Sequence, residues 1–197
     1  MAASFVQLAG AACRQPQDGA KGPGSDIPTA LRRIWIFIIA KRRLSTGGYI
    51  LERRLTAIFA ADVVGYSRLM GDDKGQTLER LKCLRNELVQ PKIRDFKGRV
   101  VKLMGDGLLA EFPSVVAAVQ CALDIQQSMN QREAGLPEGQ RIKLRIGVNL
   151  GDIIVEGSDI YGDGVNVAAR LEALAEPGGL CISSIVHESL GNRIDVQ

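Results

Sequence analysis

Residues 99–112 constrain the fold of this chain more strongly than any other stretch. Two short apolar runs, at 99–103 and 108–112, flank a Gly-Asp-Gly turn at 105–107. A glycine-containing turn between two such runs is a strong signal for a β-hairpin. The two strands of a hairpin are antiparallel, so this stretch predicts a sheet that is rich in antiparallel pairs.

The rest of the chain supplies strands and helices around this hairpin. Short apolar runs indicate strands, leucines at helical spacing indicate helices, and Ser114 is suited to cap a helix. The expected elements are, in chain order, a strand at 55–61, a helix at 77–95, the hairpin, a helix from Ser114 that ends before Gly135, a strand at 141–149, a hairpin at 151–159, a helix from 165, a strand at 180–183 and a helix at 184–190. This order predicts an α+β fold, with helices packed on an antiparallel-rich sheet.

The same periodicities predict which side chains lie inside. The inward residues should be Leu78, Leu81, Leu84 and Leu88 of the first helix, Val115, Val119, Ala122 and Met129 of the second, and Ile142, Leu144, Ile146 and Val148 of the alternating strand. Arg141, Lys143 and Arg145 then lie on the other face of that strand.

The composition is that of a globular cytoplasmic protein. Hydrophobic residues make up 46% and charged residues 24% of the 197 residues, which suits one domain with a core. The four cysteines form no CxxC pair, so we expect reduced, mostly buried thiols and no zinc site. Residues 1–54 hold nine Lys and Arg against three Asp and Glu, so the remainder is mildly acidic and the net charge of +3 does not indicate nucleic-acid binding.

Residues 1–51 are expected to form a disordered or poorly ordered basic extension, and residues 52–197 the domain. The first 30 residues mix Ala, Gly, Gln and Pro without a period. The apolar run IWIFIIA at 34–40 has basic flanks and is too short to span a bilayer, which takes about 20 helical residues. A peripheral membrane contact through this run is the alternative to a poorly ordered extension.

Residues 159–174 place two polar side chains on one helical face. If the chain is helical from Val165, Asn166 and Arg170 are four residues apart and point the same way. The glycine-containing turn at 162–164 leads into this helix, where free N–H groups favour an anion. The guanidinium of Arg170 suits phosphate oxygens. An ordinary amphipathic helix with a polar side is the alternative interpretation.

Two aspartates complement this helix. Asp62 follows the first strand and Asp106 lies at the tip of the hairpin. Two carboxylates brought together by strand pairing are suited to Mg²⁺, which prefers oxygen ligands and keeps positions for water and substrate phosphate. Each aspartate alone is equally well explained as a turn residue.

With these residues in view, the chain from about Glu52 to Gln197 resembles the catalytic domain of class III nucleotidyl cyclases, most closely the bacterial adenylate cyclases. Six positions carry the expected residue types: Asp62, Lys102, Asp106, Asp159, Asn166 and Arg170. The resemblance implies a ferredoxin-like α+β domain that converts ATP to 3′,5′-cyclic AMP and pyrophosphate. It implies that Asp62 and Asp106 hold two Mg²⁺ or Mn²⁺ ions per site. Asn166 and Arg170 would contact the ribose and the transition-state phosphate.

The resemblance also assigns Lys102 and Asp159 to the adenine base. A lysine can donate to adenine N1 and an aspartate can accept from the exocyclic amine, whereas guanine presents the opposite pattern. Guanylate cyclases usually carry Glu and Cys at these places, so the residues favour ATP, with guanylate cyclase as an alternative. Backbone N–H groups of Val63, Val64, Gly65 and Tyr66 are candidates for the β- and γ-phosphates. Either Asp62 or the metal alone could promote loss of the 3′-hydroxyl proton.

In this family the metal carboxylates of one domain face the base-reading and Asn/Arg residues of another. The chain carries both halves, which predicts a head-to-tail homodimer with two equivalent sites. Family domains usually continue into a further strand pair, so the domain is expected to be incomplete at its C-terminus. A catalytically silent nucleotide-binding or dimerisation module is therefore an alternative function. The single histidine, His187, is expected on the surface.

Overall fold

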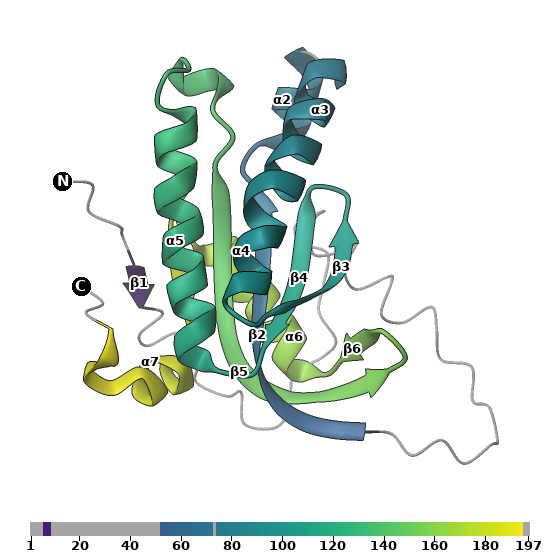
Figure 1. Ribbon diagram of the computed structural model, residues 1–197, viewed down its shortest axis with the longest axis vertical. Coiled ribbons are helices and arrows are strands. Elements are labelled where there is room, and N and C mark those ends of the chain that lie inside the picture. The colour runs from purple at the N-terminus through teal and green to yellow at the C-terminus, as the bar shows by residue number, and fades with distance from the viewer. Residues whose placement is uncertain (1–5, 9–51, 73, 195–197) are drawn as a thin grey trace, which may run out of the picture.

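The protein is built on one seven-stranded, mostly antiparallel sheet (Figure 1). The computed structural model describes residues 6–8, 52–72 and 74–194. The strands are β1 (Val6–Leu8), β2 (Glu52–Val63), β3 (Arg99–Met104), β4 (Gly107–Phe112), β5 (Leu144–Glu156), β6 (Asp159–Tyr161) and β7 (Leu180–Ile182). They lie in the order β1-β7-β5-β2-β4-β3, with β6 paired to β5, and only the β1–β7 and β5–β7 pairs are parallel.

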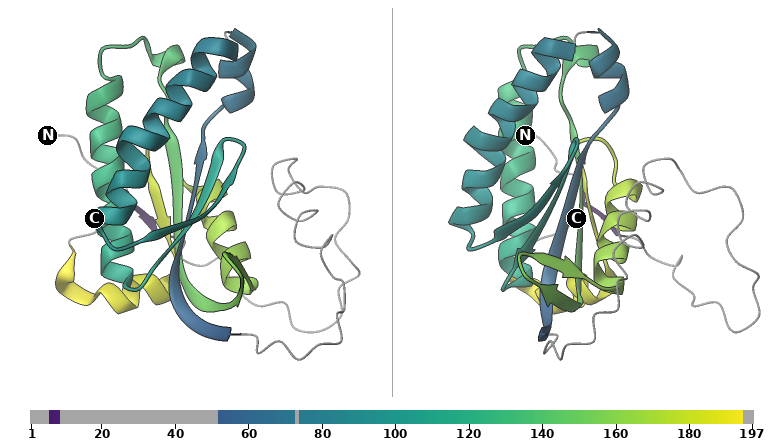
Figure 2. Two further views of the ribbon diagram at one scale, coloured as in Figure 1. Left: turned by 45° about the vertical axis from the view of Figure 1, so that its right-hand side comes forward. Right: turned by 90° about the vertical axis from the view of Figure 1, so that its right-hand side faces the viewer.

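Helices cover both faces of this curled sheet. The helical elements are α2 (Tyr66–Asp72), α3 (Lys74–Leu84), the π-helix η1 (Arg85–Val89), α4 (Gln90–Asp95), α5 (Val115–Glu133), the 3₁₀ helix η2 (Glu138–Gln140), α6 (Asp163–Leu174), α7 (Ser184–Leu190) and the 3₁₀ helix η3 (Gly191–Arg193). Figure 2 shows α3, α4 and α5 against one face and α6 against the other. The predicted α+β fold is confirmed. Within the described ranges, none of the helices combines the length and the apolarity that crossing a membrane requires.

The alternation of β2 divides the core into two parts. Ala57 and Phe59 belong to the larger cluster beneath α5, where the rings of Phe59 and Phe112 are 5.7 Å apart. Ile58 belongs to a smaller cluster that includes Ala168 of α6. Successive side chains of a strand point to opposite faces, so even-numbered residues of β2 lie on the α6 side. Asp62 is therefore on the same side of the sheet as α6.

The helix predicted at 77–95 is present but begins earlier and contains a π-helical turn. The N–H of Gln90 donates to the carbonyl oxygen of Arg85, one residue further back than in an α-helix. Pro91 follows directly and has no N–H to donate, so the wider turn accommodates it without a clash. Of the four predicted inward leucines three are buried, but Leu78 is 38% exposed. Helix α2 was not predicted.

The two predicted hairpins are present with shifted bounds. β3 and β4 pair around Gly105, whose φ of +62° is the left-handed conformation that a glycine accepts without strain. β5 starts at Leu144, so the prediction that the strand includes residues 141–143 is wrong. It continues without a break to Glu156, and the second hairpin turns at Gly157, between β5 and β6.

The helix predicted from Ser114 is confirmed, with a weak cap. The Ser114 hydroxyl accepts from the N–H of Ala117 at 3.5 Å. Of the predicted inward residues, Val119, Ala122 and Met129 are buried and Val115 is half-buried. The buried side of α5 therefore matches its sequence period.

Two short elements complete the sheet edge near α7. β7 and α7 lie close to their predicted positions, and His187 is exposed as expected. Residues 6–8, which fall in the predicted disordered extension, form β1 parallel to β7. An open edge presents unpaired N–H and C=O groups, which this segment satisfies. The apolar run at 34–40 lies outside the described residues.

The burial predicted for the cysteines is confirmed for those that the structure describes. Cys121 and Cys181 are buried, and Cys83 is half-buried. Cys13 lies outside the described residues.

Candidate active site

Strand pairing brings Asp62 and Asp106 together at one end of the sheet. Asp62 is the second-last residue of β2, and β2 pairs with β4 up to Ala61 and Leu108, so the turn that carries Asp106 lies beside it. Burial, the charge of Asp62 and a hydrogen bond with it raise the pKa of Asp106 to about 6. The sequence prediction that these two carboxylates meet is thus matched by their positions.

The two carboxylates suit a divalent cation that also binds substrate. Among the residues that the structure describes, no group of three or more His, Cys, Asp or Glu side chains is arranged to hold a metal. The candidate donors are the two carboxylates of Asp62 and Asp106, which are hydrogen-bonded to each other. Mg²⁺ commonly binds through one or two carboxylates and keeps its other positions for water and phosphate oxygens. The chemistry of the pair fits such an ion.

Arg145 lies beside Asp62 and was not predicted as a site residue. Its Nη2 lies 3.2 Å from Asp62 Oδ2, and its Nε lies 3.2 Å from Glu172 Oε1. The first contact is a hydrogen bond, whereas among the described residues neither Arg145 Nε nor Glu172 Oε1 completes one. Glu172 is only 7% exposed, and burial together with the charges of Asp62 and Asp106 raises its pKa to about 7.

The packing of α6 on β5 explains this arrangement. A Cβ on Gly147 would lie 2.3 Å from the Ala168 carbonyl oxygen and 2.3 Å from the Glu172 nitrogen, so only glycine allows this approach. Arg145 is two residues from Gly147 and shares its face of β5. The helix therefore covers the polar face of the strand and places Glu172 against Arg145.

A second arginine, Arg85, approaches the other aspartate. It lies in η1 and donates from Nη2 to the carbonyl oxygen of Gly105, at the hairpin turn. Burial lowers the pKa of Arg85 below its ordinary value, and the negative charge of Asp106 opposes that shift. Arg85 therefore supports the turn that carries Asp106 and adds positive charge near it.

Lys102 and Asp159, the predicted base-reading pair, are in contact. Lys102 Nζ lies 2.7 Å from Asp159 Oδ2, the Tyr161 hydroxyl donates to the same oxygen at 3.2 Å, and the Ile160 N–H donates to Oδ1 at 3.0 Å. Burial disfavours the charged form of Asp159, but Lys102 and these other donors outweigh it and hold its pKa below its ordinary value. Asp159 is thus a fixed, ionised acceptor.

Asn166 and Arg170 lie on α6 as predicted, away from the carboxylates of their own chain. Asn166 is half-buried and Arg170 is exposed. At about 100° per residue, Arg170 lies about 200° around the helix from Glu172, which faces Arg145 and the sheet. Arg170 forms no hydrogen bond or ion pair with another described residue. The two halves of the predicted site therefore face different directions in one protomer.

The turn after β2 is the predicted phosphate contact. The N–H of Val64 donates to the Lys143 carbonyl oxygen at 2.9 Å, so in this conformation it is not available to a phosphate. The Gly65 carbonyl oxygen accepts from the N–H groups of Arg68 and Leu69, where α2 begins. Gly65 has a φ of +65°, which makes this tight turn possible. The prediction for Val63, Gly65 and Tyr66 stays a prediction.

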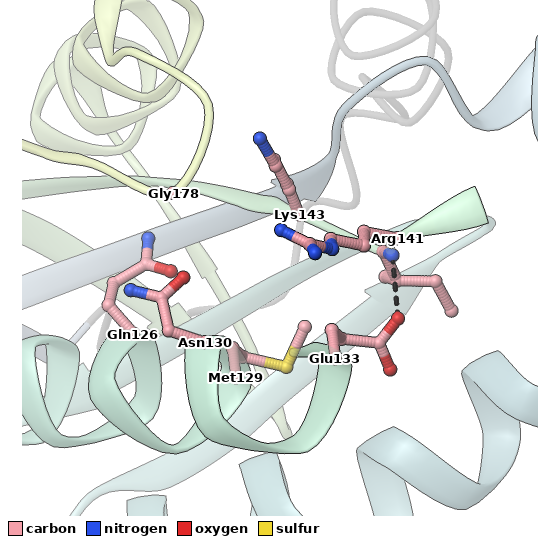
Figure 3. Close-up of a pocket in the computed structure, with 8 residues that line it drawn as sticks. Gln126, Met129, Asn130, Glu133, Arg141, Lys143 and Gly178 are labelled. Atoms are coloured by element: carbon pink, nitrogen blue, oxygen red, sulfur yellow. Dashed lines mark hydrogen bonds between the residues drawn. The ribbon is translucent and has the colours of Figure 1, made fainter. Parts of the chain in front are cut away.

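A small polar pocket lies elsewhere, between α5 and the start of β5 (Figure 3). It holds about 90 Å³ and is lined by Gln126, Met129, Asn130, Glu133, Arg141, Ile142, Lys143 and Gly178. Pockets for nucleotide-sized ligands usually hold about 300 Å³ or more. This pocket is therefore too small for a nucleotide.

The family model of the adenylate and guanylate cyclase catalytic domain matches residues 52–197. The chain belongs to this family. The cyclase domain is 53% identical over 146 residues to "Putative adenylate cyclase 3" of Rhizobium meliloti (strain 1021), covering 74% of this chain and 25% of that protein. It is 29% identical over 145 residues to an adenylate cyclase of Streptomyces coelicolor, covering 72% of this chain and 35% of that protein. The chain thus spans a quarter to about a third of these relatives.

Solved structures agree with this membership. A crystal structure named "Adenylate/Guanylate Cyclase/Hydrolase", from Silicibacter pomeroyi, is 53% identical with a TM-score of 0.70, over 73% of this chain and 84% of that one. The adenylyl cyclase CyaB from P. aeruginosa is 22% identical with a TM-score of 0.65, over 75% of this chain and 85% of that one, and shares the fold.

Sequence reasoning on this cyclase domain missed Arg145, Glu172, Arg85 and Tyr161. Alternation placed Arg145 on the second face of its strand but did not reveal that α6 covers that face. The signal that identifies it is the register of β2 and β5, in which Arg145 is directly opposite Asp62. No local pattern predicts a register between strands about 80 residues apart.

Proposed function

We propose that this domain is an adenylate cyclase that converts ATP to 3′,5′-cyclic AMP and pyrophosphate at a homodimer interface. The observation that carries the choice of ATP is the Lys102–Asp159 pair, 2.7 Å apart. A lysine donor and an ionised aspartate acceptor match adenine N1 and its exocyclic amine, whereas guanine would meet a donor with a donor. The relatives named adenylate cyclase support the same substrate.

The reaction is an attack of the ATP 3′-oxygen on the α-phosphorus. The new phosphorus–oxygen bond closes the cyclic phosphate, and the bond to the leaving pyrophosphate breaks. Two Mg²⁺ or Mn²⁺ ions would neutralise phosphate charge and lower the pKa of the 3′-hydroxyl. Asp62 and Asp106 would hold them, since they are the carboxylates that meet beside the hairpin turn.

The remaining groups orient the substrate and stabilise charge. Lys102 and Asp159 would separate to admit the base and fix the purine. Asn166 would orient the ribose, and the guanidinium of Arg170 would stabilise charge that develops on the α-phosphate in the transition state. Positioning and charge stabilisation dominate phosphoryl chemistry of this kind.

The orientation of α6 supports a site shared between two protomers. Arg170 is exposed and lies about 200° around α6 from Glu172, whose side chain faces the Arg145 beside Asp62. Arg170 of one protomer therefore cannot reach the phosphates held by Asp62 of the same protomer. A head-to-tail dimer brings Asp62 of one copy to Asn166 and Arg170 of another, with two equivalent sites.

The direct test supplies the full chain with ATP or GTP, each with Mg²⁺ or Mn²⁺, and measures both cyclic nucleotides. We expect cyclic AMP from ATP in excess over cyclic GMP from GTP, and almost no cyclic AMP from Asp106→Ala. Nucleotide binding without turnover would favour a silent regulatory module. Undiminished product from Asp106→Ala would refute the metal assignment.

The shared site has its own test, which is complementation. Asp62→Ala and Asn166→Ala chains should each be inactive, and the mixture should regain activity because one of the two sites in a mixed dimer is intact. Mixed dimers are verified with two different affinity tags. Verified mixed dimers without activity would refute the shared site.

A further inference from the structure

Arg145 lies between two carboxylates but is hydrogen-bonded to only one of them. Its Nη2 donates to Asp62 Oδ2 at 3.2 Å, while its Nε faces Glu172 Oε1 at 3.2 Å without completing a hydrogen bond. The side chains of Asp62, Arg145 and Glu172 are 20%, 26% and 10% exposed, so water screens these charges only partly.

The contact with Asp62 opposes cation binding at the same carboxylate. A guanidinium stays protonated at any physiological pH, so Arg145 offsets the negative charge of Asp62 for as long as it remains there. A divalent cation on Asp62 and Asp106 would bring a second positive charge close to Arg145. Two cations at one carboxylate repel each other, so the arginine and the metal compete.

Glu172 offers Arg145 a second partner within reach. The close packing of α6 on Gly147 fixes Glu172 beside the arginine. A guanidinium has five N–H donors in a planar fork, so a small rotation exchanges one carboxylate for the other. Arg145 can therefore release Asp62 without becoming an unpaired buried charge, which would be strongly destabilising.

We propose that Arg145 competes with the divalent cation for Asp62, and that Glu172 sets the metal affinity by holding the guanidinium when the cation binds. This inference rests on the proposed function, which assigns the metal to Asp62 and Asp106. Arg145 and Glu172 are positioning residues here, since they act through Asp62.

The competition predicts opposite effects for the two neutral substitutions. Arg145→Gln removes the competing charge and should tighten metal binding about tenfold. Glu172→Gln leaves Arg145 with Asp62 as its only carboxylate partner and should weaken metal binding about tenfold. A purely structural role for this pair predicts weaker binding in both cases.

The experiment titrates the full chain with Mn²⁺ without nucleotide and follows free Mn²⁺ by electron paramagnetic resonance. We choose pH 8, where Glu172, with a pKa of about 7, is mostly ionised. The double variant Arg145→Gln with Glu172→Gln removes the guanidinium and the more buried carboxylate together, while Asp62 keeps its hydrogen bond with Asp106. It therefore provides a result even if Arg145→Gln fails to fold. The double variant should bind Mn²⁺ more tightly than wild type. Its Mn²⁺ affinity should differ less than threefold from that of Arg145→Gln alone, because Glu172 acts through Arg145.

Arg54→Gln is the matched control. It removes the same charge from a strand residue about 26 Å from Asp62. Arg99 still pairs with Glu111, the partner of Arg54, so the fold should persist. Its Mn²⁺ affinity should stay within twofold of wild type.

Two results separate this inference from the proposed function. Equal or weaker Mn²⁺ binding by the double variant would overturn the competition while leaving the metal site in place. Wild type and Asp106→Asn that bind Mn²⁺ equally, or not at all, would refute the metal site and the competition with it.

Discussion

Two charged clusters on this sheet differ in their balance of charge. At the end of β2, Asp62 and Glu172 both contact Arg145, and Asp106 is hydrogen-bonded with Asp62. Beside β6, Asp159 is paired one-to-one with Lys102. In the first cluster the pKa values of Asp106 and Glu172 are raised to about 6 and about 7, whereas in the second the pKa of Asp159 is lowered.

The difference indicates what each cluster is suited to bind. Burial and the charges of neighbouring carboxylates raise the pKa values of Asp106 and Glu172 more than Arg85 and Arg145 lower them, so the first cluster gains stability from an added cation. The second cluster is already neutral overall and its hydrogen bonds are made. A purine that binds there must replace existing hydrogen bonds of Lys102 and Asp159. Its net binding free energy is therefore only the difference between the new hydrogen bonds and the old ones.

The largest effect is expected from breaking the first cluster at Asp62. Asp62→Asn keeps the shape of the side chain and can still accept from Arg145, but removes a charge that would hold the cations. Cyclase activity should fall about 1,000-fold, since charge stabilisation dominates this chemistry. The measurement is the initial rate of cyclic AMP formation at saturating Mn²⁺.

Asp95→Asn, at an exposed position of α4, is the control and should keep wild-type activity. If folded Asp62→Asn keeps a rate within tenfold of wild type, the carboxylate charge of Asp62 is not required for activity. The assignment of cation binding to the first cluster would then be wrong.

The same comparison shows which site residues could be predicted from the sequence. Asp62 and Asp106 were predictable because each follows a local signal, a strand end and a glycine turn. Arg145 and Glu172 were not, because they depend on the register of β5 against β2 and on the close approach of α6 at Gly147. Long-range register and helix placement are set by packing that no local pattern records.

The fold likewise has features that the sequence predicted and features that it did not. Strand and helix identities followed from period and turn residues, while boundaries shifted where tertiary contacts prevailed. Leu78 has the spacing of a core residue but is 38% exposed. β5 runs through Gly151, where a break was expected, because β2 pairs with it along this stretch, with Thr56 opposite Gly151.

Exchanging the second cluster should change the choice of base. Lys102→Glu with Asp159→Cys gives the residues usual in guanylate cyclases, a glutamate that accepts from guanine and a thiol that can donate. We expect the ratio of ATP to GTP turnover to fall about 100-fold, because the buried polar groups then match the other purine. Competition between both nucleotides in one assay measures this ratio.

Metal affinity provides the internal control for this exchange. Half-maximal Mn²⁺ should change less than threefold, since neither residue belongs to the first cluster. An unchanged ATP to GTP ratio in the folded double variant would show that the base is selected elsewhere.

The two clusters should also respond to pH in opposite directions. Asp106 and Glu172 have folded-state pKa values above their ordinary ones, so the folded state binds more protons than the unfolded state. Their contribution to stability is present at low pH and is lost as pH rises through about 6 and 7. Asp159 has the opposite sign, and its contribution is lost only when the pH falls below its ordinary pKa.

Urea unfolding in EDTA measures this effect. The free energy of unfolding should decrease by about 2 kcal/mol from pH 5 to pH 8, after allowance for solvent screening of the half-exposed Asp106. Asp106→Asn with Glu172→Gln should abolish most of the decrease. Equal stability of the wild type at both pH values would mean that folding does not raise the pKa values of Asp106 and Glu172.

The smallest effect is expected at Tyr161, because Asp159 in the second cluster already accepts hydrogen bonds from several donors. Its hydroxyl donates to Asp159 Oδ2 at 3.2 Å, the oxygen that Lys102 also contacts. Tyr161→Phe removes one donor of several, and an ordinary hydrogen bond contributes about 1 kcal/mol. KM for ATP should therefore rise about threefold with kcat within twofold, as steady-state kinetics would measure. When Lys102 leaves Asp159 to reach adenine N1, Tyr161 becomes the main side-chain donor that keeps the carboxylate oriented. An unchanged KM would mean that the Ile160 N–H alone is enough to orient the carboxylate.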